Sequence, residues 1–220
     1  MYSIVVRCLL IVSTTLILMG CGARAHNIPL AADFWEQPKQ TIVVASFKAP
    51  EPQVYYVGNQ GLLDLAVNSA MNKKMNDHLK KTELHWYHNL AVNFSDRLKK
   101  NKMNIEMYSH QPEATKKDIE AVVAHAQSNK LLTFQLRVLG ARREYYGFIP
   151  TGAPQAYCVL AGKLTDLSDK KIWWSHDVEI ILPVRGAWDQ PPSYPNFTQA
   201  LHLAMDEARE ELVDSFFSGR

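Results

Sequence analysis

The hydrophobic and polar positions of this 220-residue chain change their spacing several times, and each spacing predicts an element of secondary structure. Residues 41–47 form a continuous apolar run that ends at a lysine, which is typical of a central strand covered on both faces. Apolar and polar residues alternate at 131–139, which predicts a second strand. Residues 156–166 and 171–182 predict two more strands joined by a tight turn, and residues 104–108 predict a short one.

A period of about four residues predicts the helices. The segments that show it are 62–79, 82–102, 115–129 and 197–217. The first segment is expected to bury a stripe made of Leu63, Val67, Met71, Met75 and Leu79. Its two methionines are also compatible with an adaptable binding groove, but a core role is the simpler interpretation. The second segment has Thr82 as its expected N-cap and ends in several lysines, which suits the negative end of the helix dipole.

The predicted elements follow the order strand, two helices, strand, helix, three strands, helix. Alternation of strands and helices at the front implies parallel crossovers, whereas three successive strands joined by loops imply antiparallel neighbours. We therefore expect an α/β fold in which one mixed β-sheet (β-αα-β-α-β-β-β-α order) carries helices packed on it. A single domain over residues 40–220 is long enough for one sizeable core.

The beginning of the chain has a different pattern. Arg7 is followed by an apolar run from Cys8 to Met19, and a glycine and Cys21 come next. This run is shorter than the roughly 20 apolar residues that cross a bilayer. A cleaved signal peptide over residues 1–20 is therefore a better interpretation than a transmembrane anchor.

Residues 18–21 (L-M-G-C) resemble the lipobox of bacterial lipoproteins. This resemblance implies that Cys21 carries diacylglyceryl and palmitate and becomes the first residue of the mature protein, where several acyl chains anchor it durably. Gly22 stands where that family places an acidic signal for retention in the inner membrane, which implies an outer-membrane protein that faces the periplasm. Residues 21–39 have no periodicity and are expected to form the lipidated cysteine and a tether.

Charge and cysteine content narrow the possible partners. The chain has 24 basic and 22 acidic residues, so the mature protein without Arg7 has a net charge of +1. Such a balance argues against nucleic acid, which requires concentrated lysine and arginine. Cys8 leaves with the signal and Cys21 carries lipid, so Cys158 lacks a disulfide partner within the chain and is expected to be a small buried residue.

The sequence contains no recognisable catalytic set. His85 and His88 are spaced to share a metal on a helix, but no third ligand is specified and the glutamate of the zinc-protease motif is missing. His176 falls in the same alternating row as Trp174 and Val178, which predicts a hydrogen-bonded core histidine. We therefore predict neither catalysis, metal nor cofactor.

Two segments between the predicted strands, 140–155 and 183–196, are rich in arginine and aromatic residues. In a meander of three antiparallel strands these segments lie at the same end of the sheet, and Tyr55 and Tyr56 join them if the strand at 41–47 runs parallel to the one at 131–139. Arginine, tyrosine and tryptophan dominate protein interfaces. The predicted partner-binding residues are Arg142, Arg143, Tyr145, Tyr146, Phe148, Arg185, Trp188 and Tyr194. The alternative is that these aromatic residues pack on the domain as a satellite core.

The element order, together with V-L-A-G-K-L-T-D-L-S-D-K-K-I-W-W at 159–174, resembles a group of bacterial envelope proteins. The group includes lipoproteins that activate penicillin-binding proteins, the curli secretion channel lipoprotein and the amino-terminal domain of the Tol propeller protein. This resemblance implies a docking module that binds a protein of the envelope. Two alternatives are an auxiliary lipoprotein of a lipid or envelope transporter and an enzyme that acts on the cell wall.

Overall fold

The computed structural model describes residues 27–36, 41–108, 111, 115–126 and 128–218. The expected signal peptide and Cys21 lie outside the described residues, so cleavage and lipidation stay predictions. Within the described parts of the chain, no helix is both long enough and apolar enough to cross a membrane.

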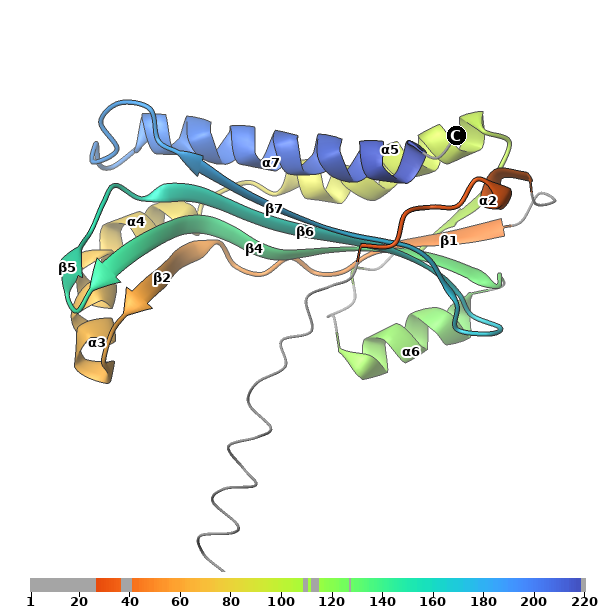
Figure 1. Cartoon of the computed structure of the whole chain (residues 1–220), viewed down its shortest axis with the longest axis horizontal. Coiled ribbons are helices and arrows are strands. Elements are labelled where there is room, and N and C mark those ends of the chain that lie inside the picture. Colours follow the sequence, from red (N-terminus) through yellow and green to blue (C-terminus); the bar gives the residue numbers. More distant parts are fainter. Residues whose placement is uncertain (1–26, 37–40, 109–110, 112–114, 127, 219–220) are drawn as a thin grey trace, which may run out of the picture.

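The domain is built on one mixed seven-stranded sheet, as Figure 1 shows. Its strands are β1 (Thr41–Ser46), β2 (Gln53–Asn59), β3 (Asn104–Met107), β4 (Lys130–Tyr146), β5 (Ile149–Pro150), β6 (Gln155–Asp166) and β7 (Ile172–Pro183). The spatial order is β3-β1-β4-β6-β7, with β2 and β5 paired to β4. Strand β1 runs parallel to β3 and β4, whereas β6 is antiparallel to β4 and β7. The predicted mixed α/β sheet, with parallel pairing at the front and an antiparallel meander at the end, is confirmed.

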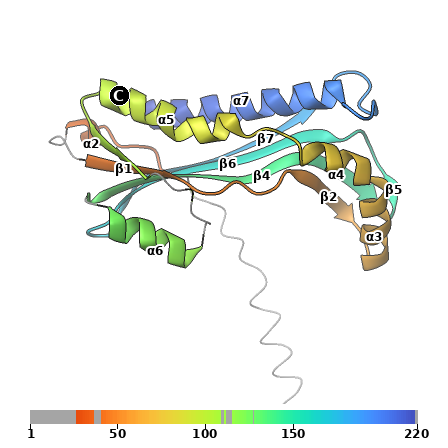
Figure 2. The ribbon, with the colours of Figure 1, turned by 180° about the vertical axis from the view of Figure 1, so that it is seen from behind.

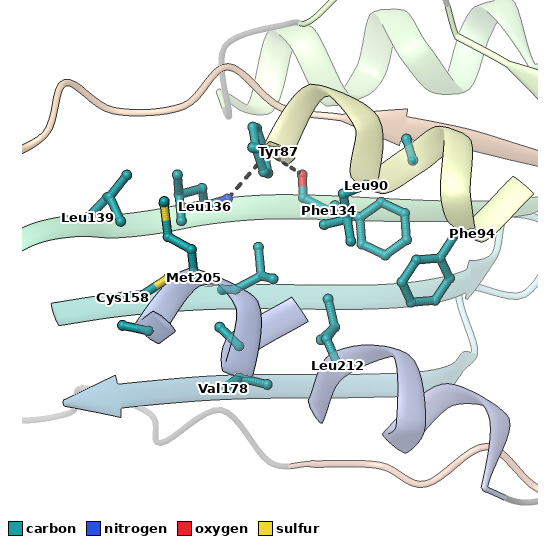
Figure 3. Packing of buried hydrophobic residues seen from close by; sticks show 14 of the residues in the cluster. Tyr87, Leu90, Phe94, Phe134, Leu136, Leu139, Cys158, Val178, Met205 and Leu212 are labelled. Carbon is teal, nitrogen blue, oxygen red and sulfur yellow. Dashed lines mark hydrogen bonds between the residues drawn. The ribbon is translucent and has the colours of Figure 1, made fainter. Parts of the chain in front are cut away.

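The helices are α2 (Asp33–Glu36), α3 (Leu62–Met71), α4 (Lys73–Leu79), α5 (His85–Lys100), α6 (Lys116–His125) and α7 (Pro195–Phe217). Figures 1 and 2 show that α5 and α7 cover one face of the sheet, while α6 lies on the other face. The main core lies under α5 and α7 (Figure 3), where Leu90 and Phe94 of α5 and Leu212 of α7 are fully buried. The apolar row of β4 faces these helices, which explains why apolar and polar residues alternate along the strand.

Tyr87 of α5 completes the hydrogen bonds of the sheet at an interruption beside β4. Strand β1 pairs with β4 up to Phe134, and β2 takes over the same edge from Gly140 onward. Between them, the Tyr87 hydroxyl donates to the Phe47 carbonyl oxygen at 2.7 Å and accepts from the Leu136 N–H at 3.3 Å. Burial raises the pKa of this hydroxyl to about 12, so the group stays a neutral donor.

The hairpin at 159–174 forms around a close contact between Gly162 and Trp174. A Cβ atom on Gly162 would lie 2.3 Å from the Trp174 ring, so only glycine leaves room for the indole. Trp174 packs on Phe216 of α7, and its indole N–H donates to the Ser215 hydroxyl at 3.1 Å. The predicted inward row of β7 is confirmed here, because Trp174 and Val178 are buried.

Several sequence expectations are wrong in detail. Strand β4 continues to Tyr146, so residues 140–146 are not a loop, and Tyr55 and Tyr56 lie in β2 rather than in a loop. The tether is shorter than 21–39, since Leu30 and Phe34 are buried in the core. The helix expected from 82 begins only at His85, and its N-cap is Leu84 rather than Thr82.

A further error concerns the helix expected at 62–79, which is broken into α3 and α4 at Asn72. The Asn72 side-chain amide donates to the Asn68 carbonyl oxygen at 2.7 Å and to the Tyr145 hydroxyl at 2.5 Å. A buried asparagine that bonds to nearby backbone competes with regular helix, which explains the break. Only Met75 and Leu79 of the expected stripe are buried, whereas Leu63, Val67 and Met71 are exposed.

Candidate functional site

The segments predicted to meet at one end of the sheet do meet there. Helices α3 and α4, the ends of β2 and β4, and the short strand β5 gather at the end that lies on the left in Figure 1. The segment that leaves β7 reaches the same end, because the Trp188 ring lies 4.6 Å from the Arg143 guanidinium. The predicted clustering of the segments 140–155 and 183–196 is therefore confirmed.

Helix α3 has an inverted polarity. Asn68 is its one fully buried residue, with 0% exposure, whereas Leu62 and Leu63 are 89% and 78% exposed. Its only ionisable side chain, Asp64, accepts from the Gly61 N–H at 2.8 Å and so caps the helix. Surface helices normally bury the apolar stripe and expose the polar one. The outward face of α3 therefore suits an apolar environment that the described residues do not supply.

The hairpin between β4 and β5 adds a second apolar surface beside α3. Tyr146 and Phe148 are 72% and 59% exposed, and Ile149 is also exposed. The Asn68 side chain joins the two elements, since it donates to the Gly147 carbonyl oxygen at 3.1 Å and to the Gln60 side chain at 2.7 Å. We call the combined surface the apolar tip; it consists of Leu62, Leu63, Val67, Met71, Tyr146, Phe148 and Ile149.

A cleft of about 340 Å³ adjoins the apolar tip. Arg143 lies in it between two rings, with its guanidinium 4.6 Å from the centre of Trp188 and 5.6 Å from that of Tyr145. One terminal nitrogen of Arg143 donates to the Asn72 side-chain oxygen. We call this site the Arg143 cleft; it is lined by Met71, Asn72, Lys74, Met75, Arg143, Tyr145, Pro150, Trp188, Asp189, Pro191 and Tyr194.

The eight predicted partner-binding residues divide into three groups. Tyr145 and Tyr194 are only 3% exposed and belong to the domain core, as the alternative interpretation expected. Tyr146, Phe148 and Arg185 are exposed. The other three, Arg142, Arg143 and Trp188, are half-buried. The second group is therefore directly accessible from outside, whereas Arg143 and Trp188 line the cleft.

The two neighbouring arginines of β4 have different surroundings. Arg142 is bonded within the protein, because it donates to the Gln155 side chain at 2.7 Å and lies 2.7 Å from the Glu144 carboxylate. Arg143 points to the opposite face, as alternation along a strand requires. The Arg143 Nε atom is buried and has no hydrogen-bond acceptor among the described residues.

Sequence reasoning missed the main part of this site, which is α3. Its apolar residues follow a helical period, and the period alone predicts that they face the core. The signal that distinguishes α3 is the pair Asn68 and Asn72, which lie four residues apart and so mark a second, polar stripe. A sequence with two competing stripes does not by itself show which one faces inward.

Other candidate groups lie away from this site. His176 is largely buried against α7, with its Nε2 atom 3.4 Å from Glu211, in agreement with the prediction. Cys158 is fully buried, and burial raises the pKa of its thiol to about 12. His85 is exposed at the start of α5, and the described residues contain no group of three or more ligands arranged for a metal.

A larger cavity of about 680 Å³ lies against the sheet face that carries α6. Its lining mixes Ile119 and Val123 of α6 with the polar row Thr133, Gln135 and Arg137 of β4. The Arg137 guanidinium is already paired with Asp177 at 2.5 Å.

No protein-family model and no curated protein matches this chain. Several solved structures resemble it. Lipoprotein GNA1162 from Neisseria meningitidis is 10% identical over 80% of this chain and 99% of that chain, with a TM-score of 0.36. Protein XCC0632 from Xanthomonas campestris is 14% identical over 86% of this chain and 90% of that chain, with a TM-score of 0.39. The LpoB C-terminal domain from Salmonella enterica is 10% identical over 69% of this chain and 92% of that chain, with a TM-score of 0.22.

A bacterial lipoprotein is among these structures, as it is in the group that the sequence resembles. With identities of 14% or less and TM-scores below 0.5, these similarities carry no argument about function.

Proposed function

We propose that this protein is a lipid-anchored periplasmic adaptor of the outer membrane, which docks through its apolar tip onto a protein component of the cell envelope. The observation that carries the proposal is the inverted polarity of α3, in which Asn68 is buried and Leu62 and Leu63 are exposed. The proposal includes no catalytic role.

Energetics support the tip as a binding surface. Fully burying a leucine or phenylalanine side chain contributes about 1.5–3 kcal/mol, and several such side chains lie together on the tip. Contiguous exposed apolar patches usually mark interaction sites. The tip is also held in place before binding, because Asn68 fixes α3 to the β4–β5 hairpin. Such preorganisation reduces the entropy that a partner must lose on docking.

The point where the described chain starts lies far from the tip. The described chain starts at Asn27, whose side chain accepts from the Asp177 N–H in β7. Asp177 aligns through β6 with Gln135 of β4, about 36 Å along the strand from Tyr146. Five residues lie between Cys21 and Asn27, and the six steps from one to the other span about 20 Å at most. This separation allows an anchored protein to direct its tip toward a partner.

Site-specific crosslinking in intact cells tests the proposal. A photo-crosslinking amino acid replaces Leu63 in the tip or, as a matched control, Leu203, which is an exposed leucine of α7. We expect position 63 to crosslink to one envelope protein and position 203 to give no such product. Crosslinks from position 63 to lipid alone, or equal products from both positions, would show that the tip is not a protein-docking surface.

A further inference from the structure

We propose that the Arg143 cleft binds a carboxylate of the docking partner, either an acidic side chain or a C-terminal carboxylate, that adjoins the apolar residues packed on the tip. This inference rests on the proposed docking function and names the chemistry of the partner. The observation behind it is that the buried Arg143 Nε–H has no acceptor within the described protein.

The charge of Arg143 is also uncompensated. No ion pair joins it to a carboxylate of the described residues, and the bond that it makes goes to the neutral amide of Asn72. Guanidinium groups bind carboxylates with two parallel hydrogen bonds, and Nε is one of the donors that such a pair uses. An incoming carboxylate would compensate this charge from the cleft that Arg143 lines.

The surroundings of Arg143 favour an anion over other ligands. Lys74 adds a second cation to the lining, whereas Asp189 is the single acidic residue among the described lining residues. Burial and the charge of Asp189 raise the pKa of Tyr194, so this hydroxyl remains neutral beside the cleft. The lining therefore has a net positive charge of one, and an anionic group complements it.

The two aromatic rings keep the guanidinium ready for binding. Trp188 and Tyr145 flank it and restrict its orientation, and their rings partly cover the guanidinium. A charge-assisted hydrogen bond is stronger in such a medium than in water. Arg142 provides the contrast within the same strand, because Gln155 and Glu144 already occupy its donors.

The cleft continues into the tip. The carboxylate is therefore expected to lie next to the apolar residues of the partner that pack on the tip. Met71 belongs to both surfaces, and Pro150 of the cleft follows Ile149 of the tip. A segment that packs apolar side chains on α3 and the hairpin therefore brings its next polar group to Arg143. The partner segment is amphipathic, with a carboxylate beside its apolar residues.

Nuclear magnetic resonance on the purified full-length protein tests carboxylate binding directly. The probes are N-acetyl-leucine and N-acetyl-leucine amide, which differ only in the carboxylate. We expect the acid to shift the Arg143 Nε–H resonance and the amide to leave it unchanged, while the Arg142 resonance stays constant with both. Equal shifts with the two probes, or no shift of the Arg143 signal with the acid, would overturn the proposal.

A second experiment separates this inference from the docking function. Crosslinking from position 63 is repeated in Arg143→Gln, with Arg142→Gln as the matched control and Arg143→Lys to retain the charge on a folded protein. We expect Arg143→Gln to reduce the partner yield about tenfold or more, as for the loss of one partner of a buried charged pair, and Arg142→Gln to leave it unchanged.

The outcomes are distinct. Full capture by Arg143→Gln would refute the carboxylate site and leave docking intact. Absence of any partner at position 63 in the wild-type protein would refute docking, whereas a probe-induced shift at Arg143 would still support the anion site. Retained capture by Arg143→Lys together with its loss in Arg143→Gln would support a requirement for positive charge at this position.

Discussion

At the scale of single residues, Tyr87 shows how one side chain replaces a missing part of a sheet. The hydroxyl of this helix residue takes the hydrogen-bonding positions that open where β1 has left β4 and β2 has not yet begun. A buried peptide group without a partner costs about 1–3 kcal/mol, so the hydroxyl is worth more than an average side-chain hydrogen bond.

Tyr87→Phe is therefore expected to destabilise the protein by about 1–3 kcal/mol, because it leaves backbone groups of the sheet unpaired. Denaturant unfolding measures the change in the free energy of unfolding. Tyr157→Phe is the control, since the Tyr157 hydroxyl donates to Glu179 at an exposed position. Equal stability of Tyr87→Phe and the wild type would contradict this role.

Predictions for single residues were correct where the alternation along a strand determines which side chains face the core. Trp174, His176 and Val178 fall in one row of β7, and that row faces α7 as the period requires. The sequence predicted nothing of the role of Tyr87, because its hydroxyl meets backbone that is 40 to 49 residues away.

At the scale of elements, α3 was predicted as a helix but with the wrong face inward. The period identified the helix, whereas the choice of face depends on what lies beside it. Asn68 faces inward because Gln60 and the Gly147 carbonyl oxygen bind its amide, and Gly147 is 79 residues away in sequence. Polar groups with specific partners have displaced the apolar stripe from the interior.

This inversion predicts an unusual pair of mutational effects. Asn68→Ala is expected to destabilise the domain by about 1 kcal/mol, because it removes the side-chain hydrogen bonds to the Gly147 carbonyl oxygen and to Gln60. Leu63→Ala is expected to change the stability by less than about 0.5 kcal/mol, since its side chain is exposed. Thermal or denaturant unfolding compares them, and a larger loss for Leu63→Ala would show that α3 is oriented differently.

Strand β2 was missed because prolines precede it and its partner is remote in sequence. It pairs in parallel with the second half of β4, where Gln53 lies opposite Gly140. Gly140 has a φ of +149°, and a Cβ atom there would lie 1.9 Å from the Gln53 carbonyl oxygen. The requirement for glycine at 140 is thus a tertiary constraint, which local propensity does not reveal.

Gly140→Ala is accordingly expected to separate the start of β2 from β4 and to loosen the end of the sheet that carries the apolar tip. Hydrogen exchange should become faster in the segment 53–59. Gly152→Ala is the matched control, because no atom lies within 4 Å of the corresponding Cβ position. Unchanged exchange at 53–59 in Gly140→Ala would show that the strand tolerates the added methyl group.

At the scale of the whole molecule, element order predicted the mixed sheet and the meeting of distant segments at one end. The strand directions follow from connection lengths and handedness, and this information is contained in the order of elements. The sequence did not predict how the side chains are arranged at that end. This arrangement depends on the break at Asn72 and on the extra length of β4, which together bring Arg143 and Trp188 to the side of α3.

The break at Asn72 also determines how the molecule responds to mechanical load. Its side-chain amide donates to the Tyr145 hydroxyl, and its side-chain oxygen accepts from Arg143, so both ends of this amide are attached to β4. A pull on α3 is therefore carried into the central strand of the sheet, which pairs with four other strands. The joint between α3 and α4 is braced, and the tip moves together with the sheet instead of swinging on a hinge.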